Sequence, residues 1–272
     1  MAKGSEAIRQ AIYDELKDDL IAIAKSKYGN FFVQKLLSYG TKEQKDKVLK
    51  TFEGKIAELT RHKIANAVVT IAYNDVAKTN QQTRYLQEFF GPEFRVCKEE
   101  DLKSAVDIAK KYPKKEGAVR RALAENCNIL ITKGCYNQSI VHSVLFNYMQ
   151  LLNYIIAKHQ NKLHEKDEKH ESNDDIKESI EESKDDNKDK SVDFSNKAKT
   201  ARTELISQLR DVCVHVLHSQ DGARLTMNAL WHGSAKDRKG KHLLFFQESR
   251  QKIQKFRYNF VIQRCKQVCF NF

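Results

Sequence analysis

Three side chains near the start of the sequence have the chemistry needed to contact a nucleotide. Asn30 and Gln34 are four residues apart, so on a helix they share one face. Each amide offers a donor and an acceptor, as the edge of a base does, and the ring of Phe31 can stack on a base. The spacing therefore predicts a base-facing set. A core phenylalanine flanked by two solvated amides would give the same pattern, so that alternative stays open.

A repeated phrase indicates which elements position these side chains. Tyr28–Thr41 matches Asp221–Ser234: a glycine opens each copy, a leucine follows eight residues later, a second glycine eleven residues later, and then a hydroxyl residue. Glycine permits the backbone angles that end a helix, and Thr or Ser is a preferred N-cap for the next one. A third copy places Ala65 at the position of Gly29, 36 residues on. Self-similarity at this period predicts an α-helical solenoid.

The other copies lose the base-facing set. The equivalent residues are Asn66, Ala67 and Thr70 in one copy and Ala223, Arg224 and Met227 in the other. Ala67 cannot stack, whereas Asn66 and Thr70 can still face a base, and Arg224 can stack or meet a phosphate. A sequence reader needs several competent units in a row. The pattern therefore favours contacts with the backbone and weak selectivity among sequences.

The charge balance points to an acidic partner. The chain of 272 residues has a formal net charge of +12, which suits nucleic acid, an anionic membrane surface or an acidic protein tail. Basic residues on the same helices and turns are candidate phosphate contacts, although each alone could be an ordinary surface charge. Besides Arg224, they are Lys25, Lys27, Lys35, Arg61, Lys63, Lys236 and Arg238.

The sequence shows no sign of an enzyme. None of the six cysteines forms a CxxC pair, and their spacing fits no zinc motif, which indicates a reduced intracellular chain. His215 and His218 lack a second pair of metal ligands, and there is no nucleotide-binding or hydrolase motif. We therefore expect no catalysis, no cofactor and no metal. No continuous apolar run reaches the ~18 residues of a membrane span.

Composition favours helix throughout, with only two prolines and ten glycines. Apolar periodicity predicts helices over 6–24, 29–37, 42–52, 55–61, 65–73, 82–90, 100–111, 117–132, 139–157 and 199–218. Trp231 is expected to pack at the end of a repeat helix. Between Glu165 and Lys190 there are twelve acidic and six basic residues, so we predict a disordered acidic insertion over 161–197. It divides helical repeats over 5–160 from a further repeat over 198–239, and 240–272 is a divergent basic tail.

The phrase within Lys25–Asp75 resembles the Pumilio-homology (Puf) repeats. Gln87–Phe94, Ser139–Leu145 and Asp221–Lys239 are similar to the nucleolar Puf-A/Penguin-like branch. The resemblance implies an all-α, right-handed solenoid of three-helix repeats whose second helices line a concave, RNA-facing surface. The set of Asn30, Phe31 and Gln34 is similar to the one that meets uracil in that family.

The same resemblance implies a function. It implies RNA binding, and also DNA binding, with low sequence preference, in ribosome biogenesis, rRNA processing or translational control, in the nucleus or nucleolus. Partners would be RNA, pre-ribosomal particles and ribosomal proteins, and the chain would be a monomer cut from a longer array. The alternative is a helical-repeat scaffold that binds acidic protein tails or ribosomal proteins.

Overall fold

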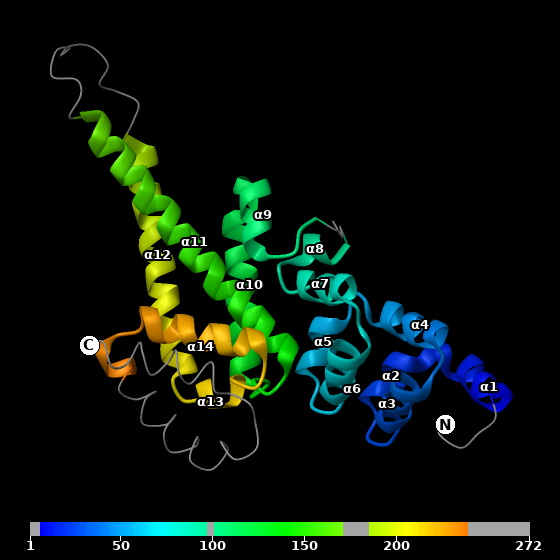
Figure 1. Cartoon of the computed structure of the whole chain (residues 1–272). Helices are drawn as coiled ribbons and strands as arrows, with labels where there is room; N and C mark the ends of the chain where they lie inside the picture. Colours follow the sequence, from blue (N-terminus) through cyan, green and yellow to red (C-terminus); the bar gives the residue numbers. More distant parts are fainter. Residues whose placement is uncertain (1–5, 97–100, 171–184, 239–272) are drawn as a thin grey trace.

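The computed structural model describes residues 6–96, 101–170 and 185–238, and within them it contains helices, turns and no strand (Figure 1). In chain order the elements are α1 Glu6–Leu16, the 3-10 turn η1 Lys17–Asp19, α2 Leu20–Lys25, α3 Gly29–Tyr39, α4 Lys42–Phe52, α5 Ile56–Arg61, α6 Asn66–Ile71, the π turn η2 Ala72–Val76, α7 Thr79–Gln87, α8 Pro92–Val96, α9 Ala105–Lys111, the 3-10 turn η3 Pro113–Lys115, α10 Glu116–Thr132, α11 Ser139–His170, α12 Asp185–Leu209, α13 Cys213–Val216 and α14 Gln220–His232.

The helices are stacked as repeating units. A short helix, a middle helix and a third helix follow one another as α2, α3 and α4, and again as α5, α6 with η2, and α7. The middle helices α3 and α6 pack against each other, while in Figure 1 α4 and α7 lie on the other side of the stack. In the last unit, α13 and α14 repeat the short helix and the middle helix. The predicted stack of three-helix units is therefore confirmed.

Glycines in the repeat phrase act through close approach, which differs from the sequence prediction. Gly40 and Gly233 follow their helices at φ −66° and −74°, angles that any residue adopts. A Cβ on Gly29 would lie 2.8 Å from the Ile23 carbonyl oxygen, and one on Gly222 would overlap the Val216 carbonyl. The opening glycine thus lets the short helix cross tightly over the start of the middle helix.

The hydroxyl residues after the second glycines are caps, as expected. Thr41 Oγ1 accepts from the Gln44 backbone N–H at 3.3 Å, and Gln44 Oε1 accepts from the Thr41 backbone N–H at 3.1 Å. Ser234 Oγ likewise accepts from the Asp237 N–H at 3.2 Å. Each cap satisfies donors that the first turn of a helix leaves without partners.

Helix α11 lies at the centre of the second half. It packs against α9, α10, α12 and α14, so its first half has to be apolar on most sides. Its residues Ser139–Asn161 are long and apolar enough to cross a membrane by length and composition, and 78% of the window that passes this test is buried inside the protein. That burial is what the core helix of a helical stack shows.

The bounds of several helices differ from the sequence prediction. The helix expected over 6–24 is broken by η1, and the one expected over 199–218 ends at Leu209 and resumes as α13. Helices α11 and α12 run through the predicted limits of the acidic insertion, to His170 and from Asp185, and they lie side by side in Figure 1. Extending an existing helix in a Glu- and Lys-rich sequence adds a hydrogen bond per residue and needs no buried core. Residues 171–184 and 240–272 lie outside the described residues.

Candidate nucleic-acid interface

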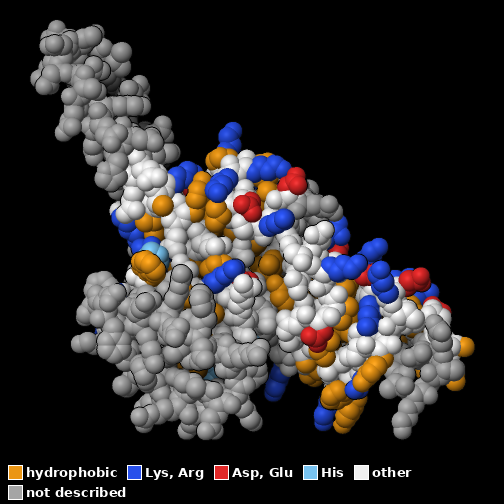
Figure 2. Space-filling view, viewed as in Figure 1, with side chains coloured by type: hydrophobic (Ala, Val, Ile, Leu, Met, Phe, Trp, Pro, Cys, Tyr) orange, Lys and Arg blue, Asp and Glu red, His pale blue; other side chains and the backbone are white. Residues whose placement is uncertain are grey.

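Middle helix α3 carries a row of exposed aromatic and basic side chains. Tyr28, Phe31 and Tyr39 are 74%, 60% and 51% exposed, and with Lys35 they follow the three- and four-residue spacing of one helix face. The Lys27 ammonium lies 5.3 Å from the centre of the Tyr28 ring, and that of Lys35 lies 5.4 Å from the Tyr39 ring. We call these five residues the α3 stripe. Figure 2 shows hydrophobic and basic side chains alternating along this edge of the molecule.

The ring of Phe31 is the part of the stripe best placed to stack. Its exposure excludes the alternative in which Phe31 belongs to the core. It lies between Tyr28 and Lys35 on the helix face, and within the residues that the structure describes no ammonium group lies over its ring. Base–aromatic stacking contributes about 1–3 kcal/mol per base and tolerates any base, since every base has a π face. The neighbouring ammonium groups can meet the phosphates on either side.

The predicted base reader Asn30 faces inward instead. It is buried, and its Nδ2 donates to the carbonyl oxygens of Ser26 at 3.1 Å and Lys27 at 2.8 Å. Its Oδ1 accepts a hydrogen bond from Gln34 Nε2 at 2.8 Å. The amide of Asn30 therefore holds the turn between α2 and α3 and has no group left for a base edge. A short side chain directly after the opening glycine lies close to that turn. It therefore hydrogen-bonds to the nearby backbone and does not point towards a ligand.

The second unit offers even less to a base. Ala67 is exposed and has no ring, and Thr70 Oγ1 donates to the carbonyl of Asn66 at 2.9 Å. Asn66 is half-buried, and Lys63 is exposed on the turn before it. Because α6 packs beside α3, these residues extend the surface of the α3 stripe. They add a charge and an amide, but no second stacking ring.

At the start of α11 the equivalent positions are used for packing. Gln138 and His142 occupy the places of Asn30 and Gln34. The residue spacing alone had not aligned this helix with the repeat. Gln138 Nε2 donates to the Thr60 carbonyl at 3.2 Å. His142 is fully buried, with its ring nitrogens 2.6 Å from Ser219 Oγ and 2.6 Å from the carbonyl oxygen of Tyr136. Burial lowers the pKa of His142 to about 4, so the imidazole is neutral and structural.

The last unit exposes a different pair. The Arg224 side chain is 54% exposed and lies 3.7 Å from Asp221. Trp231 is 68% exposed, so the expectation that it packs at the helix end is wrong. It follows Arg224 by seven residues, which puts both on one face of α14. That spacing is the signal by which the sequence could have identified Trp231 as a surface residue.

The predicted phosphate contacts separate into two kinds. Lys25 forms an ion pair with Glu58, and an Arg61 guanidinium nitrogen donates to Asn126 Oδ1, so both tie one unit to another. The others lie at the surface, with Arg238 half-buried and the rest exposed: Lys27, Lys35, Lys63 and Lys236. Lys236 and Arg238 follow α14 and stand apart from α3 and α6, with α11 between them (Figure 1).

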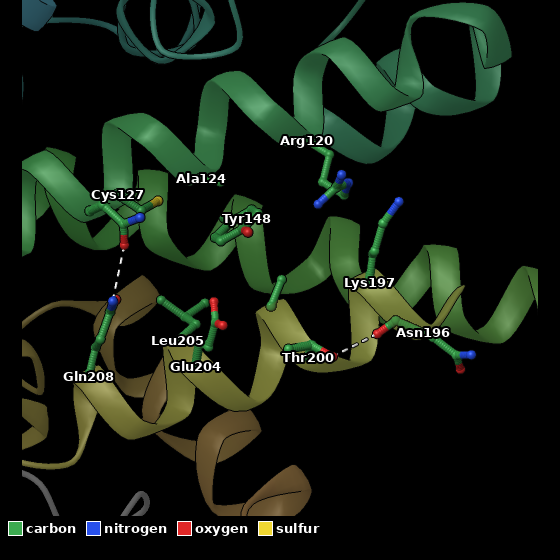
Figure 3. Close-up of a pocket in the computed structure, with 12 residues that line it drawn as sticks. Arg120, Ala124, Cys127, Tyr148, Asn196, Lys197, Thr200, Glu204, Leu205 and Gln208 are labelled. Carbon is green, nitrogen blue, oxygen red and sulfur yellow. Dashed lines mark hydrogen bonds between the residues drawn. The ribbon is translucent and has the colours of Figure 1, made fainter. Parts of the chain in front are cut away.

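A groove of about 450 Å³ lies between α10, α11 and α12 (Figure 3). Leu205, Tyr148 and Cys127 form its apolar side, and Gln208 Nε2 donates to Asn128 Oδ1 at 3.0 Å at one end. Burial raises the pKa of the Cys127 thiol, so this thiol is not a nucleophile at neutral pH. The described part of the chain also holds no cluster of three His, Cys, Asp or Glu residues that could bind a metal ion.

Comparison with known proteins shows that this stack of helices is similar to Pumilio-repeat proteins. Residues 19–50, which include α2, α3 and most of α4, match the model of the Pumilio-family RNA binding repeat. Pumilio homolog 3 of Homo sapiens is 27% identical over 237 residues, and Pumilio domain-containing protein 12 of Caenorhabditis elegans is 26% identical over 239. The crystal structure of human Puf-A superposes with a TM-score of 0.65 at 26% identity. This chain is similar to the Puf-A-like proteins of the Pumilio-repeat family.

The match extends along most of this Puf-A-like chain but only part of its relatives. It covers 88% of the chain and 38% of the human Puf-A structure. Against the human and nematode relatives it covers 87% and 88% of the chain but 30% and 25% of theirs. The predicted fold class, a right-handed α-solenoid of Pumilio-type three-helix repeats, is confirmed.

Proposed function

We propose that this Puf-A-like chain is a non-catalytic RNA-binding protein that distinguishes poorly between sequences. The α3 stripe is the observation that carries the proposal. It offers an exposed ring and exposed lysines, while of the two predicted base readers Asn30 is buried and Gln34 Nε2 is bonded to Asn30 Oδ1. Stacking and phosphate contacts hold a strand in place, but only edge contacts specify its sequence.

The comparisons support the same proposal. The family model matched by residues 19–50 is that of an RNA binding repeat. Human Puf-A has been crystallised in complex with DNA, and that structure superposes with a TM-score of 0.63 at 26% identity over 88% of this chain. A binding mode built on stacking and phosphate contacts accepts either sugar, because neither interaction needs the 2′-hydroxyl.

Fluorescence anisotropy with labelled homopolymers tests the proposal. We expect oligo(U), oligo(A) and oligo(C) to bind the whole chain with affinities within about tenfold of one another, since stacking tolerates every base. Phe31→Ala should weaken all of them by about fivefold to a hundredfold, the equivalent of one lost stacking contact. Ile129→Ala, which removes an exposed apolar side chain from α10, is the matched control and should leave binding unchanged. Tight binding of one sequence alone, or no binding of any RNA, would refute the proposal.

We further propose that the RNA is pre-ribosomal and that the chain works as a monomer in the nucleolus, in ribosome biogenesis. The likeness to the Puf-A branch and the net charge of +12 support this part. Imaging of the tagged chain, together with crosslinking and sequencing of the bound RNA, tests it. A cytoplasmic signal with crosslinks only to messenger RNA would contradict it. Protein partners that persist when no RNA is crosslinked would favour the scaffold alternative.

A further inference from the structure

A second basic surface lies on the other side of the molecule from the α3 stripe. Four lysines surround the corner between α9 and η3, and Lys158 of α11 approaches the same place. We call the set Lys110, Lys111, Lys114, Lys115 and Lys158 the corner patch. In Figure 1 α9 and α3 lie at opposite edges of the molecule, and Figure 2 shows basic side chains gathered over α9. None of these lysines was among the phosphate contacts predicted from the sequence.

Aromatic rings hold the ammonium groups of the corner patch in position. Those of Lys110 and Lys158 lie 5.9 and 5.6 Å from the centre of the Tyr154 ring. Those of Lys111 and Lys115 lie 5.5 and 5.4 Å from the Tyr112 ring. Cation–π contacts of this kind restrict the lysine rotamers before any ligand arrives. They also cover the ring faces, so the corner patch offers charge without a stacking platform.

Among the residues that the structure describes, the acidic groups around the corner patch are fewer than its lysines. Glu93 lies 2.6 Å from Lys115, and Glu116 lies 2.8 Å from Lys158. The carboxylate of Asp107 accepts from the backbone and hydroxyl of Ser104 at the start of α9. Lys110, Lys111 and Lys114 are exposed, and no salt bridge is recorded for Lys110 or Lys114 among the described residues.

These features fit a row of phosphates better than a row of bases. Lysines act as point charges that meet phosphate without selecting a base. A duplex presents its phosphates outward and hides its base faces in the stack, so it needs no stacking ring on the protein. A single strand lying on the α3 stripe would not pass over the corner patch, because the body of the solenoid lies between them.

We propose that the corner patch binds the phosphate backbone of a nucleic-acid duplex, so that one molecule holds a single strand on the α3 stripe and a stem on its opposite side. This inference rests on the proposed function, because it takes the chain to bind RNA and assigns a second part of that RNA to the corner patch. Binding both parts of the RNA at once would place the protein at a junction between a stem and an unpaired segment.

Two probes separate the two surfaces. The triple variant Lys110→Gln/Lys111→Gln/Lys114→Gln should weaken binding of a blunt-ended duplex by about tenfold. With fewer phosphates neutralised, binding releases fewer counterions from the duplex. Its affinity for oligo(U) should stay within twofold of the wild type. The matched control is Lys42→Gln/Lys47→Gln/Lys50→Gln on α4, which removes the same charge elsewhere and should leave duplex binding nearly unchanged. Circular dichroism verifies folding, and the corresponding Lys→Arg triple should restore duplex binding.

Competition completes the test. Saturating unlabelled oligo(U) should leave the labelled duplex bound, because the two probes occupy different surfaces. Mutual displacement, or equal losses of duplex binding in both triple variants, would overturn the proposal. Displacement of the duplex by polyglutamate at an equal concentration of charge would assign the corner patch to acidic proteins instead. If Phe31→Ala leaves oligo(U) binding intact while the triple variant loses the duplex, the proposed stacking site fails and the corner patch stands.

Discussion

Gln34 Nε2 donates a hydrogen bond to Asn30 Oδ1, one turn earlier on α3, over 2.8 Å. The two residues that the sequence singled out as a pair of base readers are therefore bonded to each other. Asn30 is buried with both its amide groups in use, whereas Phe31 beside it is exposed. In α3 the stacking ring of the base-facing set therefore remains exposed, whereas Asn30 is buried and used for bonds within the chain.

Asn30 should matter for stability and little for selectivity. Asn30→Ala removes the donors to two backbone carbonyls and the acceptor for Gln34, which leaves partly buried polar groups without partners. The free energy of unfolding in urea should fall by about 1–3 kcal/mol. The ratio of affinities for oligo(U) and oligo(A) should not change. A variant that is as stable as the wild type but has altered base preference would show that Asn30 does reach a base.

Lys35 and Arg61, both predicted from sequence as phosphate contacts, should behave differently. Lys35 is exposed, so Lys35→Ala should lower the affinity for every single strand and reduce the slope of log affinity against log salt by about 0.7 if one phosphate contact is lost. Arg61 donates to Asn126, so Arg61→Ala should lower the free energy of unfolding by about 1–3 kcal/mol. Salt titrations and urea melts of both variants compare the two effects. An unchanged slope for Lys35→Ala would remove it from the interface.

The opening glycine of the last unit should be intolerant of a side chain. A Cβ at Gly222 would overlap the Val216 carbonyl, which belongs to the backbone of α13 and cannot turn away. Gly222→Ala should therefore destabilise the chain by about 1–3 kcal/mol in urea, although alanine is the better helix former. The exposed substitution Ala67→Ser serves as its reference and should stay within about 0.5 kcal/mol. Equal stability of the two variants would mean that α13 and α14 can separate at little cost.

Protonation of His142 should weaken the fold in mild acid. Burial lowers its pKa from 6.5 in the unfolded chain to about 4 in the folded protein, so the unfolded state binds the proton more readily. This contribution to stability is complete above pH 6.5, declines as the pH falls from 6.5 towards 4, and is lost below that. Its size is of the order of 3 kcal/mol. Urea melts across this range should show the slope, and His142→Gln should remove it; an identical slope in the variant would assign it to other groups.

The fold was largely predictable from the sequence because the helix signals are local. The glycine phrase, the caps at Thr41 and Ser234 and the apolar stripes lie within a few residues of the structure that they specify. The bounds that failed, at η1, at Leu209 and in the acidic segment, depend on where neighbouring helices pack or on how far a helix extends once begun.

The composition and the repeat spacing by themselves determined an all-helical, basic, repeating chain, and they predicted one complete base-facing set, of which Asn30 is buried. Only the tertiary structure decided which side chains reach solvent. Arg61 reaches Asn126 in another unit, and Trp231 remains at the surface. It also brought Tyr112, Tyr154 and five lysines to one corner. Periodicity fixes the face of a helix on which a residue lies, but what covers that face depends on segments far away in the chain.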